Sequence, residues 1–365
     1  MPEALELWTS GVGVPGSTVA QARRAEEEGW DGMGVVDSQN LAADPYVEMG
    51  LAAAATDRLL LATAVTNPVT RHPAVAATAI ATVQAESGGR AVLGIGRGDS
   101  SLAHLGMAPA PVPAFARYLE RLQGYLRGEE VPFDVEADGR GEVRSSASLG
   151  LAGGPAASRL RWMRRAGVGK VPVDVAATGP RVIAAGARLA DRVTFAVGAD
   201  AERLSWAVAI ARRAREEAGL DPAALPLGAY VPVLVHPDRS RARQLISGGV
   251  ASFARFSVMH GTVAGPADEA RRRTLEAVHD AYDMDHHFTD GSPQSQVLDD
   301  EVIDAFGVAG PAPYCVERLA SLVELGLTKL FIMGGGIGMD RAEAADSRRA
   351  LVEGVLPELR RLVTA

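Results

Sequence analysis

The stretch AVLGIGRGDSSLAHLG at residues 91–106 has the pattern of a buried β-strand that ends in a polar, glycine-rich loop. Its apolar residues give way to alternating glycines, with Arg97 and Asp99 among them. A strand that is apolar along its whole length is typical of a parallel sheet, because helices cover both faces of such a sheet. In α/β proteins the loop at the carboxyl end of the strand carries the chemistry.

The same succession of an apolar strand and a helical segment recurs along the chain. The strand candidates lie at 4–10, 30–37, 59–67, 90–96, 171–178, 192–197, 225–235 and 328–335. Eight such units are the number that closes a (β/α)8 barrel. We therefore predict an α/β protein with a single TIM-barrel domain over residues 1–365. An open, doubly wound sheet is the alternative.

Two stretches interrupt this repeat. Residues 129–170, between the fourth helix and the fifth strand, have two short strand patterns (131–136 and 141–146) and a basic helix. Residues 236–312 follow the seventh strand and contain two helical segments, then a polar stretch at 283–300 that predicts a mobile loop. Neither has enough apolar sequence for a domain of its own. Both are predicted to be insertions in the barrel.

Composition narrows the class of protein. The 365 residues are 47% hydrophobic and carry a net charge of −8. This balance argues against nucleic acid or an anionic membrane as a partner. The single cysteine, Cys315, allows no internal disulfide and is expected to be an inert, packed thiol. We expect a soluble, cytoplasmic protein, because no apolar run approaches the roughly 20 residues of a membrane span and the N-terminus lacks a signal-peptide pattern.

The carboxyl ends of the predicted strands supply candidate site residues. Asp37 and Ser38 end the second strand, and Thr178 and Gly179 end the fifth. A glycine followed by Pro180 suits a helix start, where free N–H groups and the helix dipole attract an anion. Arg97 in a neighbouring loop would add a charged contact. A phosphate site is one interpretation of this pattern, and a simple helix cap and turn is the other.

Several motifs argue against other classes of site. In MGGGIGMD (333–340), a dinucleotide-binding fingerprint would require glycine where Arg341 stands, so a tight turn into the last helix is favoured. Metal ligation is not predicted, since His286 and His287 are the only close pair of histidines and adjacent residues point apart. His72 follows the third strand, where entry into the next helix is favoured over catalysis.

Three stretches together suggest a family. Residues 66–106, 171–195 and 308–332 resemble, in order, the luciferase-like flavin and deazaflavin oxidoreductases, and especially the branch that includes methylenetetrahydromethanopterin reductase. This resemblance implies a (β/α)8 barrel that binds reduced FMN or the deazaflavin F420 at the carboxyl ends of its strands. It also implies a non-prolyl cis peptide between Ala64 and Val65, in a bulge that supports the cofactor ring.

The resemblance also implies roles for individual residues. Asp37 would contact the ring system, Arg97 would hold the phosphate as in the flavin-using branch, and the backbone of 177–179 would form the phosphate turn. The implied cofactor-binding residues are Asp37, Ala64, Val65, Asn67, Arg97, Gly98, Asp99, Ala177, Thr178 and Gly179. The candidates for proton transfer are Asp99, Ser38 and His72.

We therefore expect hydride transfer between F420 and a small organic substrate. Sugar-phosphate dehydrogenases of the family carry a histidine where this chain has Ser38, which argues against glucose 6-phosphate oxidation by the same arrangement. A reduced-FMN monooxygenase is one alternative, which Arg97 favours. A non-catalytic carrier or sensor is another. A homodimer is expected from the alanine-rich helices at 46–56 and 74–82.

Overall fold

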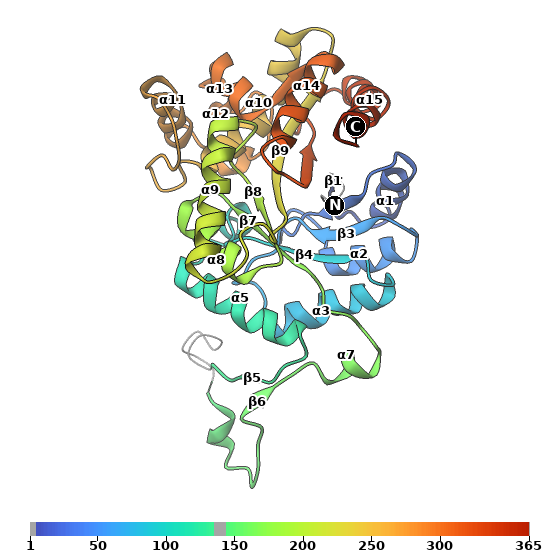
Figure 1. Ribbon diagram of the computed structural model, residues 1–365, viewed down its shortest axis with the longest axis vertical. Coiled ribbons are helices and arrows are strands. Elements are labelled where there is room, and N and C mark those ends of the chain that lie inside the picture. The colour runs from blue at the N-terminus through green and yellow to red at the C-terminus, as the bar shows by residue number, and fades with distance from the viewer. Residues whose placement is uncertain (1–4, 135–143, 365) are drawn as a thin grey trace.

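The computed structural model describes residues 5–134 and 144–364, which form a closed barrel of parallel strands (Figure 1). The barrel strands are β1 (Glu6–Gly11), β2 (Gly32–Val35), β3 (Leu60–Thr63), β4 (Ala91–Ile95), β7 (Val173–Ala177), β8 (Arg192–Phe195), β9 (Leu227–Val235) and β11 (Lys329–Met333). Neighbours follow this order around the ring, and the parallel pairing of β9 with β11 and of β11 with β1 closes it. The predicted TIM barrel is confirmed, and the open sheet is excluded.

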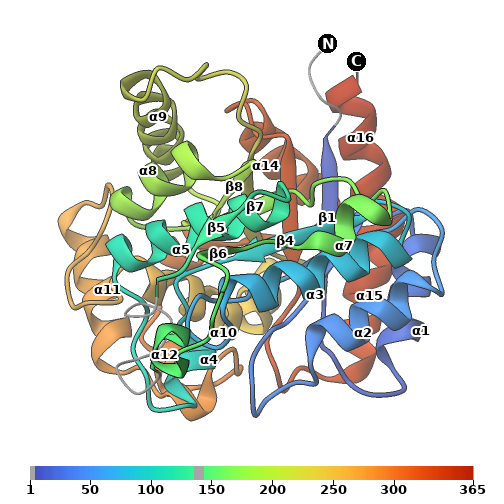
Figure 2. The same cartoon turned by 90° about the horizontal axis from the view of Figure 1, so that it is seen from below.

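Helices surround the strands (Figure 2). They are α1 (Thr18–Glu27), α2 (Pro45–Ala53), α3 (Pro73–Glu86), α4 (Ser100–Ala103), α5 (Val112–Leu126), α8 (Pro180–Leu189), α9 (Ala201–Glu217), α14 (Ala312–Val323), α15 (Arg341–Ala350) and α16 (Leu356–Thr364), the last two joined by a π-helical turn at Leu351–Val355. No helix of the described residues is long and apolar enough to cross a membrane.

Strand-end loops lead into well-defined helix starts. The Asp44 carboxylate accepts the backbone N–H groups of the first turn of α2, and the His72 ring does the same at α3. A proline follows each of them at the first helical position, where its fixed φ suits the helix and its missing N–H costs nothing. These two loops therefore have a fixed shape at the carboxyl end of the barrel.

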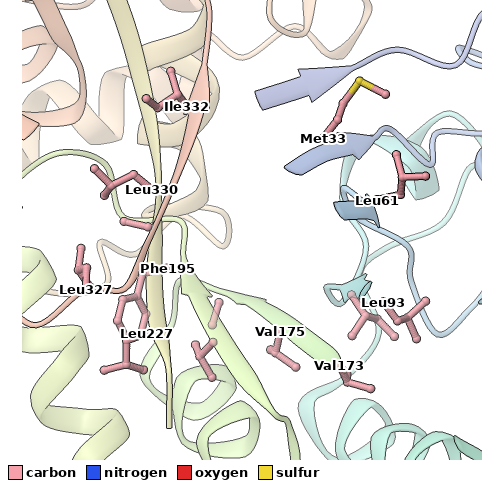
Figure 3. Close-up of a cluster of buried hydrophobic side chains, with 14 of the residues drawn as sticks. Met33, Leu61, Leu93, Val173, Val175, Phe195, Leu227, Leu327, Leu330 and Ile332 are labelled. Atoms are coloured by element: carbon pink, nitrogen blue, oxygen red, sulfur yellow. The ribbon is translucent and has the colours of Figure 1, made fainter. Parts of the chain in front are cut away.

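Side chains alternate between the two faces of the strands. Leu93, Val175 and Leu330 belong to the apolar layer between strands and helices (Figure 3). Trp8 and Phe331 face the interior, with ring centroids 6.2 Å apart. Gly32 makes this possible, because a Cβ there would lie 2.5 Å from the indole ring. The interior is thus filled by a few large rings opposite small residues.

The first insertion carries a minimal hairpin. Strand β5 (Val131–Pro132) pairs antiparallel with β6 (Ala157–Ser158), and a 3-10 turn (Ser146–Leu149) and α7 (Arg161–Arg165) belong to the same segment. The second strand, predicted at 141–146, is wrong where the structure describes it, since residues 144–145 are irregular and Ser146 begins the 3-10 turn. Residues 141–143 lie outside the described residues. In Figure 1 the hairpin lies below α3 and α5.

The second insertion consists of helices joined by turns. It contains α10 (Arg239–Phe256), α11 (Glu269–Asp280), a 3-10 turn (Met284–His286), α12 (Pro293–Gln296), α13 (Asp300–Phe306) and β10 (Val308–Gly310), which pairs with β9. Residues 283–300 contain the 3-10 turn and α12 and are otherwise turns and irregular chain, in agreement with the predicted loop, whose mobility stays a prediction. Phe288 packs edge-on against Phe253 of α10, which contacts Tyr230 of the barrel interior. Helical periodicity does not reveal such a single apolar anchor.

The cysteine prediction is confirmed. Cys315 of α14 is fully buried, and its Sγ lies 3.3 Å from the carbonyl oxygen of Gly310. Burial raises the pKa of this thiol to about 12. It therefore stays protonated and packed near neutral pH.

Candidate active site

The predicted site residues lie around one mouth of the barrel. β2, β3, β4 and β7 are successive neighbours, so their carboxyl ends meet at the same edge. The residues that follow these ends are Asp37 and Ser38 after β2, Asn67 after β3, Arg97, Gly98 and Asp99 after β4, and Thr178 and Gly179 after β7. The structure thus brings together the loops from which the site was predicted.

A bulge after β3 forms the floor of this mouth. The Ala64–Val65 peptide is cis, as the family resemblance implied. A Cβ at Gly96 would lie 3.2 Å from Val65, and one at Gly94 would lie 2.1 Å from the carbonyl oxygen of Thr63. The glycines of the 91–106 stretch therefore make room for the neighbouring chain. Ala64 and Val65 remain partly exposed, so this floor offers an apolar surface.

Asp37 is held by an arginine that the sequence analysis missed. Its carboxylate lies 2.7 Å from Arg71, whose other terminal nitrogen lies 2.8 Å from Asp44. The guanidinium also covers the ring of Tyr46 at 4.8 Å. Burial nevertheless raises the pKa of Asp37 above its ordinary value, against the opposing effect of Arg71. The signal for Arg71 was its position after the third strand, beside His72.

Several polar atoms near Asp37 are buried but unsatisfied. The Ser38 hydroxyl, the Gln39 side-chain oxygen and the Asn67 side-chain nitrogen have no hydrogen-bond partner among the described residues. The Asn67 oxygen, in contrast, accepts from the backbone N–H groups of Val69 and Thr70 at 3.0 Å. An unsatisfied buried polar group costs about 1–3 kcal/mol and is rare in native proteins. These atoms therefore fit a polar ligand.

The start of α8 has no side-chain cap and lies near two arginines. No side chain caps this helix, because the Thr178 hydroxyl donates instead to the carbonyl oxygen of Ala196. Burial and the nearby charge of Arg181 lower the pKa of Arg97. Neither arginine has a carboxylate partner among the described residues. Two unpaired cations beside free helical N–H groups attract an anion, so the simple helix-cap interpretation is not supported.

The second insertion supplies the opposite wall. Asp99 forms an ion pair with Arg255 of α10, whose guanidinium lies 4.6 Å over the ring of Tyr282. The Tyr282 hydroxyl lies 2.5 Å from Nδ1 of His287. Another contact joins Arg97 to Nε2 of His260 at 3.2 Å. Sequence reasoning missed these insertion residues because no periodic pattern or motif relates them to the barrel strands.

His72 lies at the mouth but serves the backbone. Its Nδ1 accepts the N–H of Ala74 at 3.1 Å, and its ring lies 6.3 Å from that of Tyr125. His72 is therefore the N-cap of α3, in agreement with the predicted role at the entry to that helix.

The glycine-rich segment after β11 packs against residues 288–290 of the second insertion. Asp290 donates its backbone N–H to Ile337, and Ile337 donates to Phe288 at 2.7 Å. A Cβ at Gly336 would lie 2.2 Å from the Asp290 carboxyl. Burial raises the pKa of Asp290 to about 6, and one of its oxygens lacks a hydrogen-bond partner among the described residues. The GGG sequence thus permits close packing of the wall.

With this geometry in place, a sequence model of the luciferase-like monooxygenases matches residues 5–329. The chain belongs to this family. The expected enzyme class, an F420- or flavin-dependent oxidoreductase of the family, is thereby confirmed. The match covers the first seven barrel strands and both insertions, and ends at the first residue of β11.

Individual relatives agree with this assignment. A 5,10-methylenetetrahydromethanopterin reductase of Methanolobus tindarius is 25% identical over 88% of this chain and 91% of its own. An F420-dependent glucose-6-phosphate dehydrogenase of Beutenbergia cavernae is 28% identical over 95% of this chain and 94% of its own. The solved coenzyme F420 dependent tetrahydromethanopterin reductase of Methanopyrus kandleri superposes with a TM-score of 0.72 at 22% identity, covering 98% and 99% of the two chains. At that identity the superposition supports the fold alone.

Proposed function

We propose that the protein transfers a hydride between F420 and a small organic substrate at the carboxyl mouth of the barrel. The observation that carries this proposal is the uncapped start of α8 faced by Arg97 and Arg181, beside a group of buried, unsatisfied polar atoms. Full-length relatives include an enzyme named for its F420 dependence. A phosphate-bearing, polar-edged ring system is the ligand class that such a mouth fits.

Different residues would bind the phosphate and the ring of the cofactor. Arg97, Arg181 and the N–H groups at Gly179 would hold the phosphate. Ala64 and Val65 would lie under the flat ring, a contact that favours an apolar surface. When bound, F420 would supply two-electron hydride chemistry, and the barrel would position it and exclude water.

The polar edge of the ring would meet the β2 and β3 loops. The unsatisfied hydroxyl of Ser38 and the side-chain nitrogen of Asn67 would hydrogen-bond to it, and Asp37 would contact it while held by Arg71. Asp99 is engaged with Arg255, so we assign it the role of placing that arginine. Ser38 remains a candidate for hydrogen bonding at the reacting atoms.

A reduced-FMN monooxygenase is the second candidate. Arg97 favours it, since the resemblance gives an arginine at this position the role of phosphate anchor in the flavin-using branch. FMN also offers a single phosphate to the start of α8. The two candidates therefore share a phosphate site and differ in the ring that they place over the Ala64–Val65 bulge.

Turnover separates these functions. The purified protein is mixed with reduced F420 and a panel of aldehydes, ketones, imines and enones, and reoxidation of the cofactor is followed optically under nitrogen. The proposal predicts substrate-dependent reoxidation. Oxygen consumption that depends on reduced FMN and a substrate would favour the monooxygenase. Tight F420 binding without turnover of any compound would favour a carrier or sensor.

A homodimer is the partner that we propose. Exposed apolar side chains gather on the loops after β1 and β2 and on the adjoining faces of α2 and α3, namely Val12, Val14, Leu41, Val47, Leu51 and Val75. The loops adjoin because Ala43 donates its N–H to Gly13. A second copy would cover this patch through a two-fold contact. Sedimentation should show a dimer for the wild type and a monomer for Val47→Glu/Leu51→Glu.

A further inference from the structure

The second insertion places the imidazole of His287 against the mouth. His287 hydrogen-bonds through Nδ1 to Tyr282, whereas its Nε2 has no hydrogen-bond partner among the described residues. Several ionisable groups here are engaged: Asp37 with Arg71, Asp99 with Arg255, and His72 with the backbone of α3. Two other histidines lie nearby: His260 contacts Arg97 through Nε2, and His104 has no ring hydrogen bond among the described residues that would orient it. His287 combines a ring held by a hydrogen bond at Nδ1 with an Nε2 that is free within the described part of the chain.

The surroundings of the ring show which way it faces. The charged and titratable groups that act on His287 are Asp99 and His104 of the β4 loop and Arg255 of α10, together with its neighbour Tyr282. The preceding residue, His286, instead pairs with Asp283 at 2.7 Å and is 55% exposed. His286 therefore faces solvent, and His287 faces the β4 loop.

A chain of hydroxyl groups orients the ring. The Tyr282 hydroxyl lies 3.1 Å from Ser252 Oγ, and that hydroxyl donates to the carbonyl oxygen of Gly248 at 3.2 Å. A carbonyl oxygen only accepts, so Ser252 uses its one hydroxyl hydrogen on Gly248 and must accept from Tyr282. Tyr282 thus donates its hydrogen to Ser252 and must accept from Nδ1 of His287. The hydrogen of the neutral ring then sits on Nδ1. Nε2 keeps its lone pair.

The protonation states agree with this direction. Burial lowers the pKa of His287 to about 4 and raises that of Tyr282 to about 12. Near neutral pH the imidazole is therefore uncharged and the phenol keeps its proton. The pair can receive a proton at Nε2 and lose it again without breaking its own hydrogen bonds.

We propose that His287, oriented by Tyr282, is the acid–base residue of this site. Its Nε2 takes the proton of an O–H or N–H group on the reacting carbon of the substrate and returns it in the reverse direction. This inference rests on the proposed function and deepens it, because it assigns the substrate class: alcohols or amines in one direction, ketones, aldehydes or imines in the other.

The step balances. In the oxidation the C–H bond of the substrate breaks with its electron pair, which leaves as hydride to the oxidised deazaflavin. The O–H or N–H bond breaks, its proton goes to Nε2 of His287, and its electron pair forms the C=O or C=N bond. Tyr282 holds the resulting imidazolium through Nδ1 and is a positioning residue.

Chemical modification tests the assignment without turnover. Diethylpyrocarbonate acylates the neutral imidazole, and at pH 5 a histidine with the ordinary pKa of about 6.5 is only about 3% neutral. Because its pKa is lowered, the His287 imidazole is mostly neutral at pH 5. Its rate of acylation, corrected for the solvent access of the ring, should therefore be about 30-fold higher than that of N-acetylhistidine in the same sample. Bound F420 should suppress acylation of His287 and leave exposed His286 unaffected, as mapped by mass spectrometry.

The outcomes separate this inference from the proposed function. F420 occupancy is measured by fluorescence in the same samples. If the protein binds F420 but diethylpyrocarbonate does not acylate His287, or acylates it equally with and without F420, the assignment of His287 is overturned while the proposed function stands. Protein that does not bind F420 contradicts both.

Variants test the proton transfer itself. With any carbonyl or imine that the wild type reduces, His287→Ala should lower kcat at least 100-fold, the lower range for general acid–base catalysis, and leave the Kd for F420 within threefold. Added imidazole should restore part of the rate, and Tyr282→Phe should lower kcat with little change in KM. His286→Ala is the matched control and should behave as wild type. An unchanged kcat in His287→Ala would overturn the inference.

Discussion

The two ends of the barrel use similar polar residues in opposite ways. At the amino end, Lys329 lies 2.8 Å from Asp174 across the interior, and Arg192 holds Glu6 with contacts of 2.6 and 2.8 Å. At the carboxyl end, Arg97 has no carboxylate partner among the described residues, and Ser38 has a buried, unsatisfied hydroxyl. These amino-end pairs are internally satisfied and serve the fold. The carboxyl end has ion pairs too, between Asp37 and Arg71 and between Asp99 and Arg255, but it also keeps unsatisfied polar groups, and we propose that a ligand completes it.

The largest expected effect comes from breaking the satisfied end. Lys329→Met leaves the Asp174 carboxylate buried without its cation, which should cost about 3–5 kcal/mol in the free energy of unfolding. Urea denaturation measures the loss. The double variant Lys329→Met/Asp174→Leu is the control and should recover most of it, because replacing a whole buried pair with apolar residues is nearly neutral. Equal losses in both variants would show that packing around Lys329 matters more than its charge.

The next largest effect concerns binding at the open end. Arg97→Ala removes a charged hydrogen bond to the phosphate, which should weaken F420 binding by about 1.5–3 kcal/mol, or roughly 10- to 100-fold in Kd. Its free energy of unfolding should fall by about 1 kcal/mol or less, since within the described residues Arg97 makes no ion pair and only a hydrogen bond to the Ala110 carbonyl oxygen at 3.1 Å and the contact with His260. Fluorescence titration measures the affinity. Exposed Arg213 of α9 supplies the control, and a similar loss in Arg213→Ala would point to general electrostatic attraction.

The smallest expected effect concerns the protonation of Asp290 at the wall of the mouth. The folded protein holds the Asp290 proton more tightly than the unfolded chain, since burial raises the pKa from 3.8 to about 6. The contribution of this group to stability is therefore largest below pH 4 and is lost as the pH rises to about 6. Because the carboxyl is half exposed, we expect a loss of only about 1 kcal/mol. In urea unfolding from pH 4 to 7, Asp290→Asn should lack this decline; parallel curves for the two proteins would contradict it.

The sequence predicted the barrel well because its signals are local. The strand segments are apolar along their length, and their order in the chain is also their order around the ring. Asp37, Arg97 and Thr178 follow directly from the rule that strand ends carry function. The cis peptide at Ala64–Val65 required the family resemblance, since nothing in the composition of that strand indicates it.

The wall that the second insertion forms could not be predicted from strand and helix patterns. Arg255 and Asp99 are 156 residues apart in sequence and meet through tertiary packing alone. Phe288 packs against Phe253 and anchors a polar stretch that the sequence predicted only as a mobile loop, and Gly336 after β11 lies close to the Asp290 carboxyl of that stretch. Pairings between a barrel loop and an insertion depend on how the insertion folds, which periodicity does not give.

The most direct test of the central claim, that the open end is a deazaflavin site, is a pair of titrations of cofactor-free protein with F420 and with FMN, followed by intrinsic fluorescence. F420 should bind at least tenfold more tightly than FMN, a difference of about 1.4 kcal/mol, and Arg97→Ala should weaken its binding. Tighter binding of FMN, or no binding of F420, would contradict a deazaflavin site.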